Sequence, residues 1–319
     1  MKKKVFFFLI TTISLFAASA NGAPMAYSVN SDGQDQETFD SLYLIDLAIS
    51  GSEQRRGPLV TGDDTVFWDT EGLAFAPDGT LWGVDDNARI LFPINTTTAT
   101  INFLEIISLP PSIPTGGSND FGMTFACDNT LYLTSVITRT LYHFDEQGNS
   151  TMVGGAGALG ANISAIAAIG NPARLYGLGN GLLESGAIDS PNLYSIDTTT
   201  GIATLIGPLT NALPYNEGGL AFDGSGKLWA ITDRSGLNNQ PSQVLSIDVG
   251  TGLATPVSVT VETGFESLAI APPANCEFQI GRGYDDPYDR IPTLGPIGLL
   301  LTTLALMIVG MIFLRRRIS

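Results

Sequence analysis

The sequence predicts an all-β fold, a five-bladed β-propeller, because a unit of four short strands returns at a regular interval. The position that Leu73 holds in the first clear copy recurs at Met123, Ile166, Leu220 and Leu268, at intervals of 50, 43, 54 and 48 residues. Intervals of this length suit four-stranded propeller blades. We therefore expect one blade for each copy.

The copy at residues 71–104 shows the unit in detail. Its apolar runs end at Gly, Pro, Asp or Asn, as in antiparallel strands joined by tight turns. Pro77-Asp78-Gly79 predicts the first hairpin, since Pro fixes φ and Gly accepts a positive φ. Residues 89–94 are the expected third strand, and residues 99–104, rich in β-branched side chains, are the expected fourth.

The two ends of the repeat region complete one further blade. Residues 266–270 have the pattern of an inner strand with no blade after it, whereas 26–29 and 42–46 resemble later strands with no inner strand before them. Pairing of the first and last strands would close the ring and cover its edges. A six-bladed ring is the alternative, but the only unassigned stretch of comparable length, 53–69, is polar and contains the break Arg55-Arg56-Gly57-Pro58.

Both chain ends carry the pattern of an exported protein. Lys2 to Lys4 precede an apolar run and the small residues Ala18-Ser19-Ala20, so residues 1–20 are expected to be a secretory signal peptide. Residues 295–314 carry no charge and are long enough to span a bilayer as a transmembrane helix. The Arg cluster after them would stay in the cytoplasm, which leaves the preceding chain outside it.

Between these ends the chain divides into a domain and a linker. Residues 21–276 hold the repeats and form the expected propeller domain. Residues 277–290, EFQIGRGYDDPYDR, contain Gly, Pro and acidic side chains without periodicity and are expected to be a linker. Residues 291–319 form the C-terminal segment.

That segment combines a short motif, an apolar span and a basic end. The motif is Ile291-Pro292-Thr293-Leu294, and the basic end is Arg315, Arg316 and Arg317. This order resembles the IPTL-CTERM class of protein-sorting signals over residues 291–319. The resemblance implies a bacterial exported protein that an exosortase-type membrane transpeptidase recognises and processes. It also implies a location at the inner membrane facing the periplasm before processing, and at the cell surface or outside the cell afterwards.

One departure from the class follows the motif directly. Many members continue with Ser-Glu-Trp-Gly, whereas this chain has Gly295-Pro296-Ile297-Gly298. The alternative is a plain single-pass membrane anchor.

The expected domain and linker are strongly acidic. Residues 21–290 carry 9 basic and 31 acidic residues, a net charge of −22. Such a charge disfavours nucleic acid and anionic lipid as partners. It favours cations, uncharged glycans or a cationic protein surface.

Five polar residues stand just before, or at the start of, successive inner strands: Glu71, Asp120, Asn162, Glu217 and Glu266. A propeller gathers such positions around one mouth of its central channel. Carboxylate and amide oxygens are the ligands that hard cations such as Ca²⁺ prefer. We expect these residues to be a Ca²⁺ site, with a rim of polar side chains that cap strand ends in water as the alternative.

No catalytic residue can be named from the sequence. His143 is the only His and lies within an expected strand, so no Ser-His-Asp or Cys-His pair is predicted. The fragments Glu71-Gly72, Asn119-Asp120 and Asn216-Glu217-Gly218 are similar to parts of metal-dependent gluconolactonase-like propellers, which have six blades. We therefore expect a surface-associated binding module, with a metal-dependent hydrolase or a structural extracellular-matrix protein as alternatives.

The two cysteines, Cys127 and Cys276, would lie in a compartment where disulfides persist. Each follows an inner strand, so both should lie on the same face of the ring. They belong to blades that are not adjacent, and the sequence leaves open whether they pair.

Overall fold

The computed structural model describes residues 23–33, 40–62, 69–114, 119–145, 147–183, 185–271 and 276. The chain divides into two compact units, Met1–Glu277 and Phe278–Ser319, and all described residues belong to the first. The predicted signal peptide, linker, sorting motif and transmembrane helix lie outside the described residues. Within the described part of the chain, no helix is long and apolar enough to cross a membrane.

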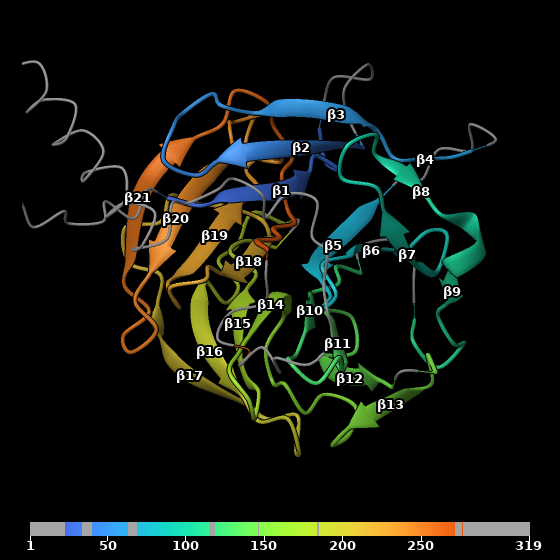
Figure 1. Cartoon of the computed structure of the whole chain (residues 1–319). Helices are drawn as coiled ribbons and strands as arrows, with labels where there is room; N and C mark the ends of the chain where they lie inside the picture. The colour runs from blue at the N-terminus through green and yellow to red at the C-terminus, as the bar shows by residue number, and fades with distance from the viewer. Residues whose placement is uncertain are drawn as a thin grey trace, which may run out of the picture. The chain divides into compact units, whose positions relative to one another are not determined.

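The domain is an all-β, five-bladed propeller, as predicted (Figure 1). The second blade contains β5 (Thr70–Phe75), β6 (Leu81–Asp85), β7 (Ile90–Ile94) and β8 (Thr100–Ile101). The third contains β10 (Met123–Phe125), β11 (Leu131–Ser135), β12 (Thr140–Phe144) and β13 (Ser150–Val153). The fourth contains β14 (Ile163–Ile169), β15 (Arg174–Gly179), β16 (Asn192–Ile196) and β17 (Ala203–Pro208). The fifth contains β18 (Gly218–Phe222), β19 (Leu228–Thr232), β20 (Gln243–Ile247) and β21 (Ala254–Val259).

The first blade is built from both ends of the domain. It contains β1 (Met25–Val29), β2 (Ser41–Asp46) and β3 (Gln54–Pro58). Tyr27 of β1 forms an antiparallel bridge with Ala269, so the residues around Ala269 take the inner position. Chain segments from the two ends of the domain thus lie side by side and close the ring (Figure 1).

The predictions for the outer strands need two corrections. The stretch 53–69, which was expected to be an unassigned polar segment, supplies β3 and the short strand β4 (Val60–Thr61), which pairs with β8 in parallel. The break Arg55–Pro58 therefore lies inside β3, at the exposed edge of the first blade, where a ladder tolerates Gly and Pro.

The fourth strand predicted at 99–104 was also wrong in its length. Only β8 remains of it, and a 3₁₀ turn, η1 (Phe103–Glu105), follows. Asn102 stops the strand because its side-chain oxygen accepts from the Leu104 N–H over 3.2 Å and its amide donates to Glu105 over 2.8 Å. A further strand, β9 (Ile107–Ser108), then pairs with β7.

The hydrophobic core lies between the blades. The buried apolar residues form five clusters, and each cluster joins two neighbouring blades, including the fifth blade and the first. Aromatic rings cross these interfaces, as in the contacts of Trp82 with Phe125 and of Tyr176 with Phe222 at centroid distances of 6.3 and 5.4 Å. Each blade therefore depends on its neighbours for buried surface.

Glycine permits the inner strands to approach closely around a narrow centre. A Cβ atom at Gly219 would lie 2.2 Å from the backbone nitrogen of Leu268, and one at Gly72 would lie 2.8 Å from the carbonyl oxygen of Phe121. The central cavity lined by the inner strands has a volume of about 10 Å³, which is room for about one water molecule. The centre of the channel therefore has no room for a bulky ligand.

Candidate functional site

One end of the channel gathers acidic side chains, and we call it the acidic mouth. The inner strands β5, β10, β14 and β18 begin at this end, and their antiparallel partners end there, as the pairing of Thr70 with Asp85 and of Gly218 with Thr232 shows. Residues just before an inner strand and residues just after a second strand therefore share this face.

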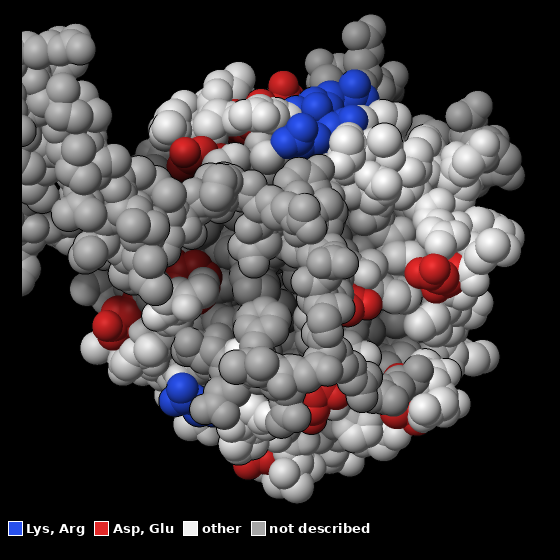
Figure 2. Space-filling model, viewed as in Figure 1, with Lys and Arg blue, Asp and Glu red and all other residues white. Residues whose placement is uncertain are grey.

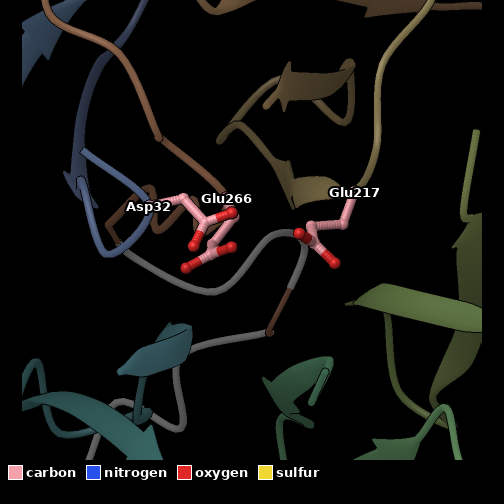
Figure 3. Close-up of side chains that lie close together, drawn as sticks. All are labelled: Asp32, Glu217 and Glu266. Atoms are coloured by element: carbon pink, nitrogen blue, oxygen red, sulfur yellow. The ribbon is translucent and has the colours of Figure 1, made fainter. Parts of the chain in front are cut away.

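The first acidic group of the mouth comprises Asp32, Glu217 and Glu266. Asp32 lies in the β1–β2 loop, and Glu217 is the residue before β18. Glu266 lies in the segment that supplies the inner position of the first blade (Figure 3). Each offers one carboxylate oxygen, and the three oxygens lie within 4.8 Å of one another. Glu266 is buried and accepts a hydrogen bond from the Ser31 hydroxyl. Glu217 is half-buried and Asp32 is exposed.

The second acidic group comprises Asp69, Glu71 and Asp86, on the second blade. One carboxylate oxygen from each again lies within 4.8 Å of the others. Glu71 and Asp86 are buried, and Asp69 is half-buried. The structure thus divides the predicted site residues, because Glu71 lies in this group while Glu217 and Glu266 lie in the first.

Asp120 and Asn162, the other two predicted ligands, have protein partners. The Asp120 carboxylate accepts from the Asn180 amide over 2.9 Å and also shares a side-chain hydrogen bond with Glu217. Asn162 donates its amide to Asp189 over 2.7 Å. Asp120 therefore joins the first group at its edge, whereas the Asn162 amide is held by a residue of the loop between β15 and β16.

Burial and mutual repulsion raise the pKa values of the acidic mouth. Burial is the largest cause for Glu71, Glu217 and Glu266, and it raises the pKa of each carboxyl well above its usual range. The charges that act most strongly on these three pKa values belong to other carboxylates. Asp233, buried at the end of β19, also belongs here, since burial raises its pKa to about 6 and Asp32 adds to the effect.

Two basic side chains on this face donate hydrogen bonds to the backbone. Arg89 donates to the carbonyl oxygens of Pro110 and Ile113, and Arg234 donates to those of Pro214 and Pro241. In Figure 2 the largest basic patch lies over β3, the outer strand that carries Arg55 and Arg56, while acidic side chains are spread around the ring. Ionisation of its carboxyl groups would make the acidic mouth negative.

The donor set fits a hard cation. Both groups offer carboxylate oxygens, and neither contains a His or Cys, which zinc prefers. Three carboxylates around one point suit Ca²⁺, which takes further ligands from carbonyl groups and water. Such an ion would oppose the repulsion that raises the pKa values.

Sequence reasoning missed Asp32, Asp69, Asp86 and Asp233. A signal for two of them was available, since Asp86 and Asp233 each follow an apolar second strand and must therefore reach the same face as the start of the inner strand. Asp32 and Asp69 lie in loops, and no periodicity places them.

The opposite face carries a disulfide between Cys127 and Cys276. Their sulfur atoms are bonded at 2.01 Å, with the Cα atoms 5.2 Å apart. Cys127 lies in the turn after β10, so the bond joins the third blade to the chain that follows the first blade's inner segment.

No protein-family model matches the sequence, and no curated protein matches it. Among solved structures, the chain is similar to a virginiamycin B lyase from Staphylococcus aureus, with 17% identity, 75% of this chain and 70% of that chain covered, and a TM-score of 0.41. It is also similar to XC5397 from Xanthomonas campestris, described as a gluconolactonase, with 12% identity, coverage of 76% and 78%, and a TM-score of 0.45. A chain of a nidogen/laminin complex has 11% identity, coverage of 76% and 83%, and a TM-score of 0.44. These likenesses concern the fold alone.

Proposed function

We propose that this chain is an exported, surface-associated binding module that holds Ca²⁺ at its acidic mouth and there binds a glycan or a protein. The observation that supports the cation is the convergence of Glu217 and Glu266 with Asp32, where the charges that act most strongly on the two glutamates are other carboxylates. A divalent cation supplies the positive charge that these side chains lack.

The energetic reason is the cost of ionising buried carboxyl groups side by side. Glu266 is only 4% exposed, and a buried carboxylate without a counter-charge favours protonation. A bound Ca²⁺ stabilises the ionised form and leaves coordination positions open to ligand oxygens. Hydroxyl groups of a neutral glycan, or carbonyl and carboxylate oxygens of a protein, are suitable occupants of those positions.

Export and sorting rest on the chain ends. The pattern of residues 1–20 supports secretion, and Ile291 to Leu294, the apolar span 295–314 and the terminal arginines support recognition by an exosortase-type processing enzyme. The helix would hold the protein in the inner membrane, with the propeller in the periplasm, until processing releases it to the cell surface or beyond. Intact-mass measurement on protein from the native host tests this, since processing predicts a C-terminus near Ile291. A chain that retains Ser319 would indicate a plain anchor.

A metal-dependent hydrolase is the second candidate, and Asp233 favours it. Burial raises the pKa of this carboxyl to about 6, and the carboxyl acts electrostatically on Glu217 and Glu266, so it could serve as a general base beside a bound ion. Its two oxygens accept hydrogen bonds from Ser235, which fix its position. A lactone screen with Ca²⁺ present, in which Asp233→Asn abolishes any turnover without loss of Ca²⁺ binding, would favour the hydrolase over the binding module.

Calorimetric titration of Ca²⁺ into the full-length chain, purified in detergent, tests the proposed site. Asp32→Asn and Glu217→Gln should each weaken binding, because each removes a ligand charge while it keeps the side-chain shape. Asp78→Asn is the matched control, since Asp78 is exposed in the β5–β6 turn at the other face. If Ca²⁺ binds, a glycan array probed with and without Ca²⁺ then tests the ligand class.

A further inference from the structure

The second acidic group lies on paired strand ends of the second blade. Thr70 at the start of β5 pairs with Asp85 at the end of β6. Asp69 and Glu71 flank Thr70, and Asp86 follows Asp85, so the sheet register itself brings these acidic residues together. The carboxylate oxygens of Asp69, Glu71 and Asp86 lie within 4.8 Å of one another.

Two more carboxylates, both fully enclosed, adjoin this group. Asp40 is 1% exposed, and its Oδ1 accepts a hydrogen bond from the backbone N–H of Asp69 over 3.0 Å. Asp85 is 0% exposed, and its Oδ1 accepts from the N–H of Ala88 over 2.6 Å. Each of these hydrogen bonds fixes one oxygen of a carboxylate.

The second oxygen of each buried carboxylate has no hydrogen-bond partner among the described residues. These atoms are Oδ2 of Asp40 and Oδ2 of Asp85. A buried polar atom without a partner is costly, and folded proteins normally satisfy such atoms with water, an ion or another group. Here both atoms belong to acids and stand beside three further carboxylates, so a cation meets the requirement better than a neutral donor does.

We infer that the domain binds a second divalent cation, a hard ion such as Ca²⁺, at Asp69, Glu71 and Asp86 against the buried carboxylates of Asp40 and Asp85. This site lies between the first and second blades, because Asp40 precedes β2 whereas the other residues belong to the second blade. It shares no residue with the group of Asp32, Glu217 and Glu266. The ion would join the first blade to the second.

This inference stands apart from the proposed function, and a count of the bound ions separates them. Equilibrium dialysis of the full-length chain in detergent against radioactive Ca²⁺ counts the ions bound per chain. The wild type should bind one ion more than either Asp69→Asn or Asp86→Asn, and Asp32→Asn should lose the other ion only. Asp78→Asn, which removes an exposed acid of the same blade, should bind as many ions as the wild type.

Asp69→Asn is the variant that is expected to fold, since Asp69 is only half-buried. The substitution also keeps the hydrogen bond to Asp40, because the backbone N–H of residue 69 donates it. Far-UV circular dichroism identifies a folded variant, and if Asp86→Asn fails to fold then Asp69→Asn decides. Wild-type ion counts in both Asp69→Asn and folded Asp86→Asn would overturn the inference and leave the proposed function intact. If the wild type binds a single ion, and that ion is lost in Asp69→Asn but retained in Asp32→Asn, the result would support the inference and contradict the site at Asp32, Glu217 and Glu266. A wild type that binds no Ca²⁺ would overturn both.

Discussion

The backbone N–H of Tyr27 donates to the carbonyl oxygen of Ala269 over 2.8 Å, and the N–H of Ala269 donates to the carbonyl oxygen of Tyr27 over the same distance. Next to this pair, the Ser28 hydroxyl donates to the carbonyl oxygen of Ser267. The hydroxyl of Ser267 in turn accepts from the N–H of Val29 over 3.0 Å. The two ends of the domain are therefore joined by backbone and side-chain hydrogen bonds, and the ring closes without a covalent bond between these strands.

Because the inner segment of the first blade closes the ring, a destabilising substitution there should destabilise the whole domain. Phe265 is fully buried and packs edge-on against Tyr43 at a centroid distance of 5.2 Å. Phe265→Ala should lower the free energy of unfolding by about 3–5 kcal/mol, measured by urea denaturation. Transitions followed by fluorescence and by circular dichroism should still coincide, because neighbouring blades share buried surface.

Phe103→Ala is the control for that experiment. Phe103 is 70% exposed, so its truncation should change stability by no more than about 0.5 kcal/mol. Equal effects of the two substitutions would contradict the closure described above.

The narrow centre predicts a large difference between two glycines of the fifth blade. A Cβ at Gly219 would meet the backbone nitrogen of Leu268 at 2.2 Å, whereas a Cβ at Gly224 would have no neighbour within 4 Å. Gly219→Ala should therefore cost about 1–3 kcal/mol or more through overpacking, and Gly224→Ala should be close to neutral. Thermal unfolding of both variants checks this, and a Gly219→Ala variant as stable as the wild type would show that the inner strands have room to separate.

The disulfide predicts sensitivity to reductant. Cys127 and Cys276 are 149 residues apart in sequence, so their bond restricts most of the domain in the unfolded state. Its reduction should lower stability by about 2–5 kcal/mol, seen as a lower Tm. The Cys127→Ser/Cys276→Ser double variant should melt like the reduced wild type and should not respond to reductant. If reduction leaves the Tm of the wild type unchanged, the disulfide does not stabilise the domain.

The raised pKa values predict that the metal-free domain loses stability as pH rises. Burial raises the pKa of Asp40 and of Asp85 from 3.8 to about 7, and that of Asp233 to about 6. The folded state therefore holds protons that the unfolded chain has released, so this contribution is complete below pH 3.8 and disappears as pH rises through about 7.

Thermal melts in chelator from about pH 5 to about pH 8 measure this effect, because this range brackets the raised pKa values. Tm should fall as pH rises, and saturating Ca²⁺ should reduce the slope because the ion stabilises the ionised carboxylates. A Tm in chelator that rises over this window would mean that these carboxyl groups are not held neutral in the folded domain.

The architecture could be predicted from the sequence because each inner strand carries a strong local signal. Leu73 and its equivalents in the other four blades are all buried. Gly79, in the turn after β5, has the positive φ that glycine accepts. The outer strands could not be predicted as well, since β8 and β9 are each only 2 residues long. There the hydrogen bond that the Leu104 N–H donates to the Asn102 side chain outweighs the strand preference of the β-branched residues.

The candidate site could be predicted only in part for a related reason. Glu71, Glu217 and Glu266 lie next to strands that the pattern locates, so their common face follows from the fold. Asp32 and Asp69 reach the mouth from loops, whose paths depend on tertiary contacts. The pairing of Asn162 with Asp189 depends likewise on the loop after β15.

The most direct test of the cation at the acidic mouth is the melting temperature of the full-length chain with Ca²⁺ or with chelator. An ion that binds only the folded state should stabilise it by about 2.7 kcal/mol at a hundredfold excess over Kd. The double variant Glu71→Gln/Glu266→Gln should lose this response, and its Tm in chelator should exceed that of the wild type because two buried, mutually repelling acids are gone. A wild-type melting curve that millimolar Ca²⁺ leaves unmoved would contradict the account and reduce the mouth to a rim of polar side chains.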